Sequence, residues 1–363
     1  MQTPIARFNL VPWQELHAGS AVGVVAFHRN GIERVQFRLH EWSCDVILPT
    51  YNPASRTVEY WCTLPAAAKN DGAIIAVIHP RCGSSRDVRV LSSDLSQPPD
   101  HLRIVRNEVI TGKLQPRKGE RFLWLDSCTL KGGDHWRGGW WERIFTTDCV
   151  GDGSGSEGRF FLECELARHC SVHNFASDAF RDCAMVIGGE CTNQIASGVD
   201  HADCVQLLQP LDDVIIYGLS AIDRIAEQGL FCRGADVVRN NVAIVDNRFH
   251  LSGYPSQNQW MDRVHHMVMT HNEFRGAPLT IKMGDSKASG FAGSTDVLIE
   301  RNLFQWLSVI DARSSVVDVA ALAPDVCIDD NAFLNAWPAN VARERQGRPI
   351  GRLLGTRAVQ LDA

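Results

Sequence analysis

The sequence predicts an all-β protein in which a parallel β-helix follows a small antiparallel β-sandwich. Four segments of alternating apolar residues end in Asn-x-Phe and begin 25, 30 and 29 residues apart: residues 242–249, 267–274, 297–304 and 326–333. This period is close to one coil of a solenoid. Earlier in the chain, short strand-like runs alternate with turn signals, and no long amphipathic helix pattern interrupts either region.

The N-terminal region, residues 1–95, predicts the sandwich. Its strand-like runs lie at residues 21–28, 33–40, 57–64 and 73–80. Through the segments "VVAFHRNGIERVQF", "YNPASRTVEYW" and "NDG", this region resembles an immunoglobulin-like module found at the front of bacterial and phage right-handed β-helix proteins. The resemblance implies an architecture and carries no reaction with it.

The repeat pattern predicts that residues 96–335 form the β-helix. Equivalent residues of successive coils lie about 4.8 Å apart, so the recurring Asn is expected to form a buried amide ladder and the Phe a stack. Asn107 and Cys164 are expected at the Asn position of earlier coils. A second strand set is expected at residues 184–189, 204–209, 228–233, 278–283 and 307–312.

This repeat resembles the right-handed parallel β-helix of pectate-lyase-like proteins, and the resemblance covers roughly two thirds of the chain. It implies a right-handed solenoid. Residues 336–363 lose the period, and we expect this tail to cap the solenoid or to contact a neighbour.

The composition excludes some classes of partner. With 36 basic and 42 acidic residues the formal charge is -6, so nothing attracts the chain to nucleic acid or to an anionic membrane. No run approaches the roughly 18 apolar residues of a membrane span. The start, "MQTPIARFNL", lacks the features of a signal peptide. We therefore expect synthesis in the cytoplasm.

Twelve cysteines occur without a Cys-x-x-Cys pair. Some recur near the coil period, namely Cys164, Cys183, Cys204 and Cys232. We expect buried thiols that serve as small apolar fillers, and a reducing compartment of synthesis.

A polar segment, "SGVDHADCVQ", is the first candidate for chemistry. It holds Asp200, His201, Asp203 and Gln206, and a carboxylate beside a His suits general acid and base work. The segment is similar to the Asp-Pro-His-Asp element of β-helix uronate epimerases, although Ala202 intervenes and the proline is missing. The alternative is that these groups satisfy a turn between coils.

A column of outward residues is the second candidate. If Val205, Leu230 and Leu279 point inward, Gln206, Phe231 and Thr280 point outward together, and Leu208, Arg233 and Lys282 form the next column. A degenerate coil near residues 249–256 would put Arg233 and Lys282 roughly 10 Å apart. Asp223 and Arg224 are expected to join this face. The alternative is a solvated surface.

The loop "KGGDHWRGGWW" is the third candidate. Exposed Trp136 and Trp140 would pack on sugar rings, and Arg137 would hold a carboxylate or sulfate. Alternatively, the aromatic residues plug the junction between the sandwich and the β-helix.

No strong metal motif is present. His265 and His266 lack further ligands nearby, so we expect no zinc and no other cofactor. Calcium binding by loop aspartates remains an alternative, and residues 149–158 have a composition that resembles a calcium-binding loop.

Two functions fit these observations. In the first, the protein recognises a long acidic polysaccharide and acts as a lyase, epimerase or glycoside hydrolase, with Asp200, His201 and Asp203 as acid and base, and Arg233 and Lys282 neutralising charge. In the second, it is a non-catalytic structural or adhesive protein, such as a phage tail, virion or surface-fibre component, which forms a homo-oligomer. Display on a virion or cell surface suits either function.

Overall fold

The computed structural model describes residues 3–12, 14, 16–53, 55–65, 73–91, 101–154, 158–195, 202–232, 238–252, 259–277, 279–283, 293–305, 307–310, 325–334 and 357–358. Strands dominate these residues and no helix occurs among them, which confirms the all-β class. The described ranges accordingly contain no helix with the length and apolarity needed to cross a membrane.

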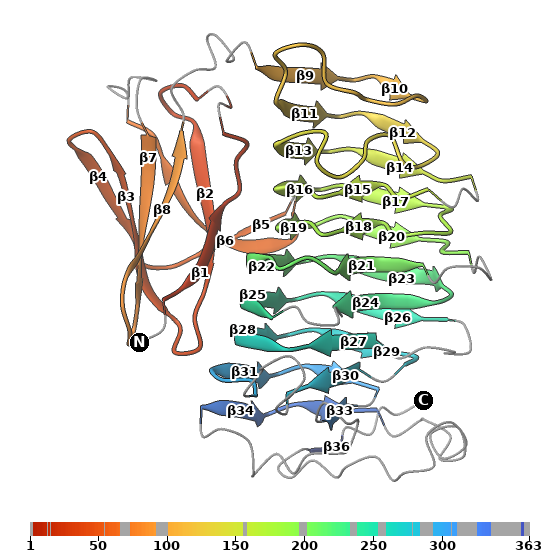
Figure 1. The fold of residues 1–363 in the computed structure, drawn as a ribbon. Coiled ribbons are helices and arrows are strands. Elements are labelled where there is room, and N and C mark those ends of the chain that lie inside the picture. Colours follow the sequence, from red (N-terminus) through yellow and green to blue (C-terminus); the bar gives the residue numbers. More distant parts are fainter. Residues whose placement is uncertain are drawn as a thin grey trace.

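An antiparallel sandwich forms the N-terminal part, and it lies beside a stack of coils (Figure 1). One of its sheets has the order β1 (Ile5–Phe8), β2 (Ala21–Phe27), β6 (Thr57–Thr63), β5 (Thr50–Asn52). The other has the order β4 (Trp42–Val46), β3 (Ile32–Leu39), β7 (Ala73–Pro80), β8 (Arg86–Leu91). The four predicted strands are confirmed as β2, β3, β6 and β7.

The stack of coils is a parallel β-helix, as predicted, and it has three sides. The first side comprises β9 (Leu102–Arg106), β11 (Phe122–Asp126), β13 (Arg143–Thr147), β16 (Leu166–Arg168), β19 (Met185–Ile187), β22 (Asp212–Tyr217), β25 (Arg239–Val245), β28 (Val264–Thr270), β31 (Val297–Glu300) and β34 (Val326–Asp329). The second side comprises β10 (Val109–Ile110), β12 (Thr129–Lys131), β14 (Val150–Asp152), β17 (Ser171–His173), β20 (Glu190–Thr192), β23 (Ser220–Ile225), β26 (Arg248–Leu251), β29 (Glu273–Arg275), β32 (Leu303–Phe304), β35 (Ala332–Phe333) and β36 (Arg357–Ala358). The third side comprises β15 (Phe161–Leu162), β18 (Phe180–Arg181), β21 (Asp203–Leu207), β24 (Gln228–Cys232), β27 (Gln259–Asp262), β30 (Leu279–Lys282) and β33 (Leu307–Ile310).

A two-residue corner joins the first side to the second in every coil. The first corner residue has a positive φ, which reverses the chain within one residue. In chain order these residues are Asn107, Ser127, Asp148, His169, Gly188, Gly218, Asp246, His271, Arg301 and Asp330. The second corner residue is buried where it is Cys128, Cys149, Cys170 or Leu219, and in the later coils it is the recurring, buried Asn.

The recurring Asn residues form the expected ladder. The Oδ1 atom of Asn272 accepts hydrogen bonds from the backbone N–H and the Nδ2 of Asn247, at 3.0 and 2.9 Å. Asn302 and Asn331 repeat this pattern at 2.9–3.0 Å. Each Nδ2 also donates to a first-side carbonyl of the preceding coil, as Asn272 does to Ile244 at 2.7 Å. The amides are therefore buried and satisfied, and their structural role is confirmed.

Cysteines occupy the same corner position in earlier coils. The register places Cys128, Cys149 and Cys170 in the column that Asn247 and the later Asn residues continue. The Cys128 thiol donates to the carbonyl of Val105 at 3.3 Å and that of Cys149 to Leu125 at 3.5 Å, which are the carbonyl positions that the Asn amides bind. All twelve cysteines are free, and most are buried, as expected.

The Phe of each repeat stacks on the next. Ring centroids are 5.4 Å apart for Phe249–Phe274 and for Phe274–Phe304, and 5.8 Å apart for Phe304–Phe333. The rings of Phe249, Phe274 and Phe304 are buried in the solenoid core, where their faces exclude water between coils.

Three sequence assignments are wrong in register. Asn107 lies in the positive-φ column, one residue before the Asn position. Cys164 follows β15 at the corner between the third and first sides. Residues 184–189 contain β19, a first-side strand, so they do not belong to the second strand set. In each case a local apolar pattern suits two of the three sides, and only inter-coil pairing distinguishes them.

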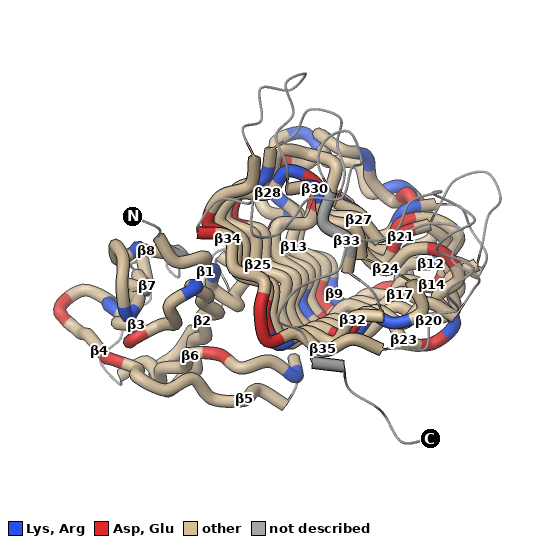
Figure 2. The backbone as a smooth tube through the Cα atoms, turned by 90° about the horizontal axis from the view of Figure 1, so that it is seen from below, with Lys and Arg blue, Asp and Glu red and all other residues tan. Residues whose placement is uncertain are grey.

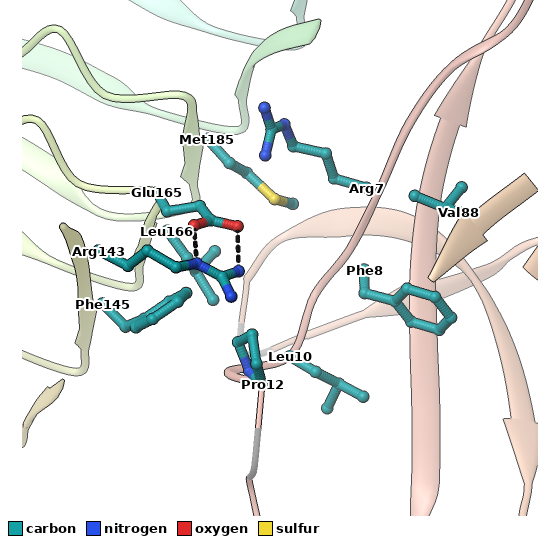
Figure 3. Close-up of a pocket in the computed structure, with 10 residues that line it drawn as sticks. All are labelled: Arg7, Phe8, Leu10, Pro12, Val88, Arg143, Phe145, Glu165, Leu166 and Met185. Atoms are coloured by element: carbon teal, nitrogen blue, oxygen red, sulfur yellow. Dashed lines mark hydrogen bonds and ion pairs between the residues drawn. The ribbon is translucent and has the colours of Figure 1, made fainter. Parts of the chain in front are cut away.

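The sandwich packs on the outer face of the first side. Ile5, Val11 and Val25 form a hydrophobic cluster with outward residues of that side, including Phe145 and Tyr217. Figure 3 shows this junction where it encloses a pocket of about 80 Å³, with Arg143 and Glu165 paired on the solenoid wall. The two parts therefore share a buried apolar interface.

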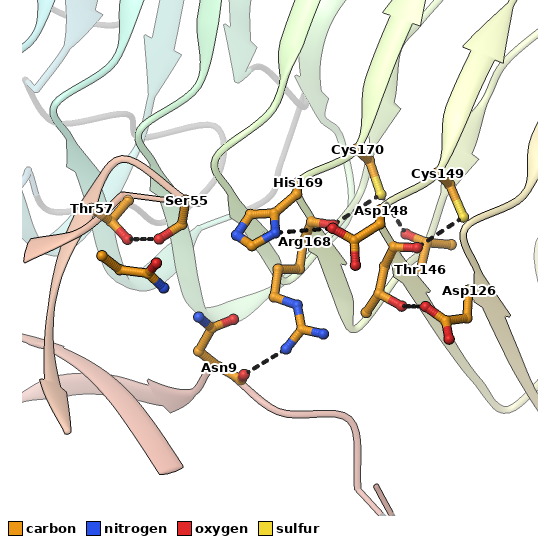
Figure 4. Close-up of polar contacts among 12 residues, drawn as sticks. Asn9, Ser55, Thr57, Asp126, Thr146, Asp148, Cys149, Arg168, His169 and Cys170 are labelled. Carbon is orange, nitrogen blue, oxygen red and sulfur yellow. Dashed lines mark hydrogen bonds and ion pairs between the residues drawn. The ribbon is translucent and has the colours of Figure 1, made fainter. Parts of the chain in front are cut away.

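The β5–β6 turn packs against the solenoid at the two coils whose first corner residue is a glycine, Gly188 and Gly218. A Cβ atom on Gly188 would lie 2.9 Å from the Ser55 carbonyl oxygen, and one on Gly218 would lie 2.7 Å from the Thr57 side chain. The fully buried Glu59 carboxylate accepts from Ser55 and Thr57, both at 2.7 Å. Figure 4 shows this turn beside the corner residues of neighbouring coils. The missing side chains make room for the sandwich.

A change at the Asn ladder tests its contribution. Asn272→Ala is expected to lower the free energy of unfolding by about 3 kcal/mol, because buried groups of Asn247 and Ile244 lose their partners. Cys149→Ala, at the same position of an earlier coil, is the matched control, with an expected loss of about 1 kcal/mol. Urea unfolding followed by circular dichroism measures both. Equal losses would contradict a dominant role for the amides.

The junction predicts a pH dependence. Burial raises the pKa of Asp213, but its two-bond ion pair with Arg86 and the charge of Arg7 outweigh burial, so that the pKa is lowered. A lowered folded pKa contributes stability above the unfolded value of about 3.9 and loses it as pH falls through the folded value. We expect Asp213→Asn to flatten the dependence of stability on pH below about 4, measured by urea unfolding at each pH. Parallel curves for wild type and variant would refute this.

Candidate functional site: the third side of the solenoid

The third side of the solenoid faces away from the sandwich (Figure 2). Its register confirms the predicted columns, because Val205 pairs with Leu230, and Gln206 with Phe231. The strand between β24 and β30 is β27, however, and it does not come from residues 249–256. Residues 249–251 belong to β26 on the second side. Trp260 of β27 therefore lies between Phe231 and Thr280, and the buried Asp262 lies beside Lys282 in the next column.

One end of this face carries an aromatic and charged group. The Nζ of Lys282 lies 5.2 Å from the Trp260 ring centroid and 3.9 Å from Oδ2 of Asp262. Trp260 is partly exposed, and the side chain of Lys282 is 14% exposed. Trp260 and Asp262 were not predicted from the sequence, because the coil between β24 and β30 was placed at residues 249–256, before the observed strand Gln259–Asp262. The alternation in Gln259–Asp262 was the available signal.

The predicted acid and base residues do not meet Lys282 in the described part of the chain. Asp203 is fully buried at the start of β21 and accepts a 2.6 Å bond from Nε2 of Gln206. Lys282 ends β30, three strands along the side, which is about 14 Å of coil spacing alone. Asp200, His201 and Arg233 lie outside the described residues.

Asp223 and Arg224 lie on another side of the solenoid, so their predicted place is wrong. Both belong to β23, which pairs with β20 and β26 on the second side. The two-residue corner after β22 turns the chain onto that side before these residues are reached. Both side chains are exposed there.

The indole of Trp136 is buried, which overturns its predicted exposure. It is 1% exposed, and its Nε1 donates to the carbonyl of Leu162 at 2.8 Å. Trp141 is 5% exposed and donates to Leu114 at 2.9 Å. Both belong to the solenoid core and not to the junction with the sandwich. They fill the third side of a coil that has no third-side strand among its described residues.

The remainder of this loop presents an exposed cationic cluster, which we call the end cluster. Arg137 is exposed with its guanidinium 5.7 Å from the ring centroid of Trp140, which is itself partly exposed. Lys113, Arg117 and Lys118 lie exposed on the preceding loop. The two loops are held together by His135, whose Nδ1 is 2.9 Å from the carbonyl of Gly112.

A groove of about 560 Å³ lies beside the end cluster, at the corner between the third and first sides. The backbone N–H of Gly139 donates to Oε2 of Glu163 at 3.2 Å and so connects the loop to the groove. The groove is lined by Arg7, Glu142, Arg143, Glu163, Cys164, Glu165, Asp182, Ala184, Gln209 and Leu211.

Most charges in this groove already have partners. Glu142 pairs with Arg121, whose hydrogen bond lowers the pKa of that carboxyl, and Glu165 pairs with Arg143. Among the described residues, no cation lies within ion-pair distance of Glu163. The groove therefore offers carboxylate oxygens as hydrogen-bond acceptors, a chemistry that suits hydroxyl groups.

Within the described ranges, no group of three or more His, Cys, Asp or Glu side chains is placed to hold a metal. Asp152, in the segment considered for calcium, accepts bonds from Lys131 at 2.5 Å and Asn174 at 3.2 Å. These bonds lower its pKa to about 2. Residues 155–157 of that segment lie outside the described residues, and calcium stays a prediction.

Fold and site together define a parallel β-helix protein with an N-terminal antiparallel sandwich and a groove at the corner between the third and first sides. Comparison with protein-family models, with curated proteins and with solved structures finds no match.

The two tryptophan environments predict different responses to substitution. Trp136→Ala is expected to lower the free energy of unfolding by about 4 kcal/mol, because it leaves a cavity in the core and an unpaired carbonyl. Trp140→Ala is expected to cost about 1 kcal/mol. Denaturant unfolding of both variants measures the difference, and a larger loss for Trp140→Ala would reverse the assignment.

Proposed function

We propose that the protein recognises an extended glycan along its third side, from the end cluster through the groove to Trp260 and Lys282. The observation that carries the proposal is the groove of about 560 Å³. In coil order, the solenoid residues that line it follow the Arg137–Trp140 pair and precede the Trp260–Lys282 pair. Trp140 and Trp260 are five coils apart, or roughly 24 Å. This spacing suits a chain of several sugar units.

The chemistry of each part fits a different feature of a sugar chain. The partly exposed indoles of Trp140 and Trp260 offer apolar faces to pyranose rings. Carboxylates in the groove accept bonds from sugar hydroxyls. Cations of the end cluster attract carboxylate or sulfate groups, which supports the acidic form of the glycan at that end. The groove itself favours neutral units.

A more specific version of this proposal is that the protein is pectate-lyase-like and has an immunoglobulin-like N-terminal module. It would then be displayed on a phage particle or a bacterial surface. This version would make the protein a lyase, epimerase or hydrolase, acting through Asp200, His201, Asp203 and Lys282. The distance between Asp203 and Lys282 weighs against one shared catalytic centre. We therefore propose recognition without bond cleavage.

A structural or adhesive rod is the second candidate. The continuous Asn ladder and Phe stack make a stiff solenoid, and the buried junction keeps the sandwich beside it. This candidate predicts a homo-oligomer whose mass is measured directly in solution.

Affinity electrophoresis on a panel of neutral and uronate-containing polysaccharides tests recognition. We expect Trp140→Ala and Trp260→Ala each to weaken binding about tenfold, through loss of ring stacking. Arg106→Ala is the matched control, since Arg106 is an exposed arginine 5.0 Å from an indole centroid on the first side.

Three other outcomes contradict parts of the proposal. Undiminished binding by both tryptophan variants would remove the third side as the site. Shortened chains would establish cleavage, and new ultraviolet absorbance from unsaturated uronates would make it a lyase. No binding across the panel would leave the structural rod as the function.

A further inference from the structure

A second, smaller cleft lies between the β5–β6 turn of the sandwich and the corner that joins the first side to the second. Its volume is about 160 Å³, well below the roughly 300–1,000 Å³ of sites for drug-sized ligands. It is lined by Tyr51, Arg56, Gly218, Leu219, Ser220, Asp246 and Arg248. A single small molecule fits such a space.

The walls of this cleft are fixed by buried interactions. Glu59 accepts hydrogen bonds from Ser55 at 2.7 Å and Asn52 at 3.1 Å, which hold the turn that carries Tyr51 and Arg56. On the opposite wall, the backbone N–H of Leu219 donates to Asn247 of the ladder at 2.9 Å. The cleft is therefore formed before a ligand arrives.

Five polar side chains line the cleft. Within the described ranges, the side chains of Tyr51, Arg56, Ser220, Asp246 and Arg248 make no hydrogen bond or ion pair. Arginines elsewhere at this junction are engaged, as Arg86 is with Asp213 and Arg168 is with the Asn9 carbonyl. The polar groups of the cleft are thus free to bind a ligand.

Charge and shape indicate the chemical class of this ligand. Two guanidinium groups and one carboxylate line the cleft, which gives it a net positive charge and favours a monoanion. The pKa of Asp246 is raised, because burial outweighs the opposing charges of Arg248 and His271. Asp246 and Ser220 are acceptors for hydroxyl groups. Tyr51 is 57% exposed and offers a ring face.

We infer that this cleft binds a single uronic acid unit, with its carboxylate between Arg56 and Arg248, its hydroxyls on Asp246 and Ser220, and its ring against Tyr51. The site is at the corner of the first and second sides, whereas the glycan site proposed above follows the third. The inference does not depend on that proposed function. A bound unit would touch the sandwich and the solenoid together.

Isothermal titration of the full-length protein with D-glucuronate tests the inference, with D-glucose and acetate as matched probes. Saturable binding of glucuronate is expected, and glucose, which lacks the charge, should bind at least about tenfold more weakly. Arg56→Ala and Arg248→Ala should each weaken glucuronate binding about tenfold or more. Arg38→Ala, an exposed arginine on β3, should leave it unchanged.

The outcomes separate this site from the third side. Arg248→Ala should bind polysaccharide as the wild type does. A negative result for one proposed site therefore leaves the proposal for the other site testable. Among the described residues, the side chains of Arg56 and Arg248 have no hydrogen-bond or ion-pair partner, so their variants should show unchanged unfolding. The inference is overturned if wild type shows no saturable glucuronate binding, if both variants bind normally, or if acetate binds as tightly as glucuronate.

Discussion

The two-residue corner between the first and second sides is the constraint on which the rest of the structure depends. Its first residue has a positive φ in every coil. Where the second residue is Asn, or is Cys128 or Cys149, its side chain bonds to a carbonyl of the coil before. Because the corner never changes length, successive strands pair in register next to it on both sides. The register shifts further along β23. Asparagine supplies two donors and one acceptor at this position, and cysteine supplies one weak donor, so the amide part of the column is the stronger.

The same corner determines where the sandwich and the ligand sites lie. Gly188 and Gly218 meet the positive φ without a side chain, which leaves room for Ser55 and creates the small cleft beside Asp246. Loops of different lengths are confined to the other two corners, next to the third side. Variation in length is tolerated there because no ladder crosses those corners continuously, and binding sites are commonly built in such segments.

The candidate site shows which parts of the prediction depended on local pattern and which on pairing. The column of Gln206, Phe231 and Thr280 follows from strict alternation, and the register confirms it, although all three residues are buried. Trp260 was missed because a weakly patterned segment had to be assigned to one of three sides. Asp223 and Arg224 were placed on the wrong side for the same reason. Trp136 is buried because its coil fills the third side with indoles instead of a strand.

The sequence by itself determined the all-β class, the sandwich and the solenoid, because alternation and a repeat of coil length are local properties that survive without coordinates. It also determined the structural role of Asn247, Asn272, Asn302 and Asn331. Only the tertiary structure decided which strands share a side, which tryptophans are exposed, and where Arg56 and Arg248 meet across the junction. These features arise from contacts between coils and between domains, and such contacts join residues that no local pattern relates.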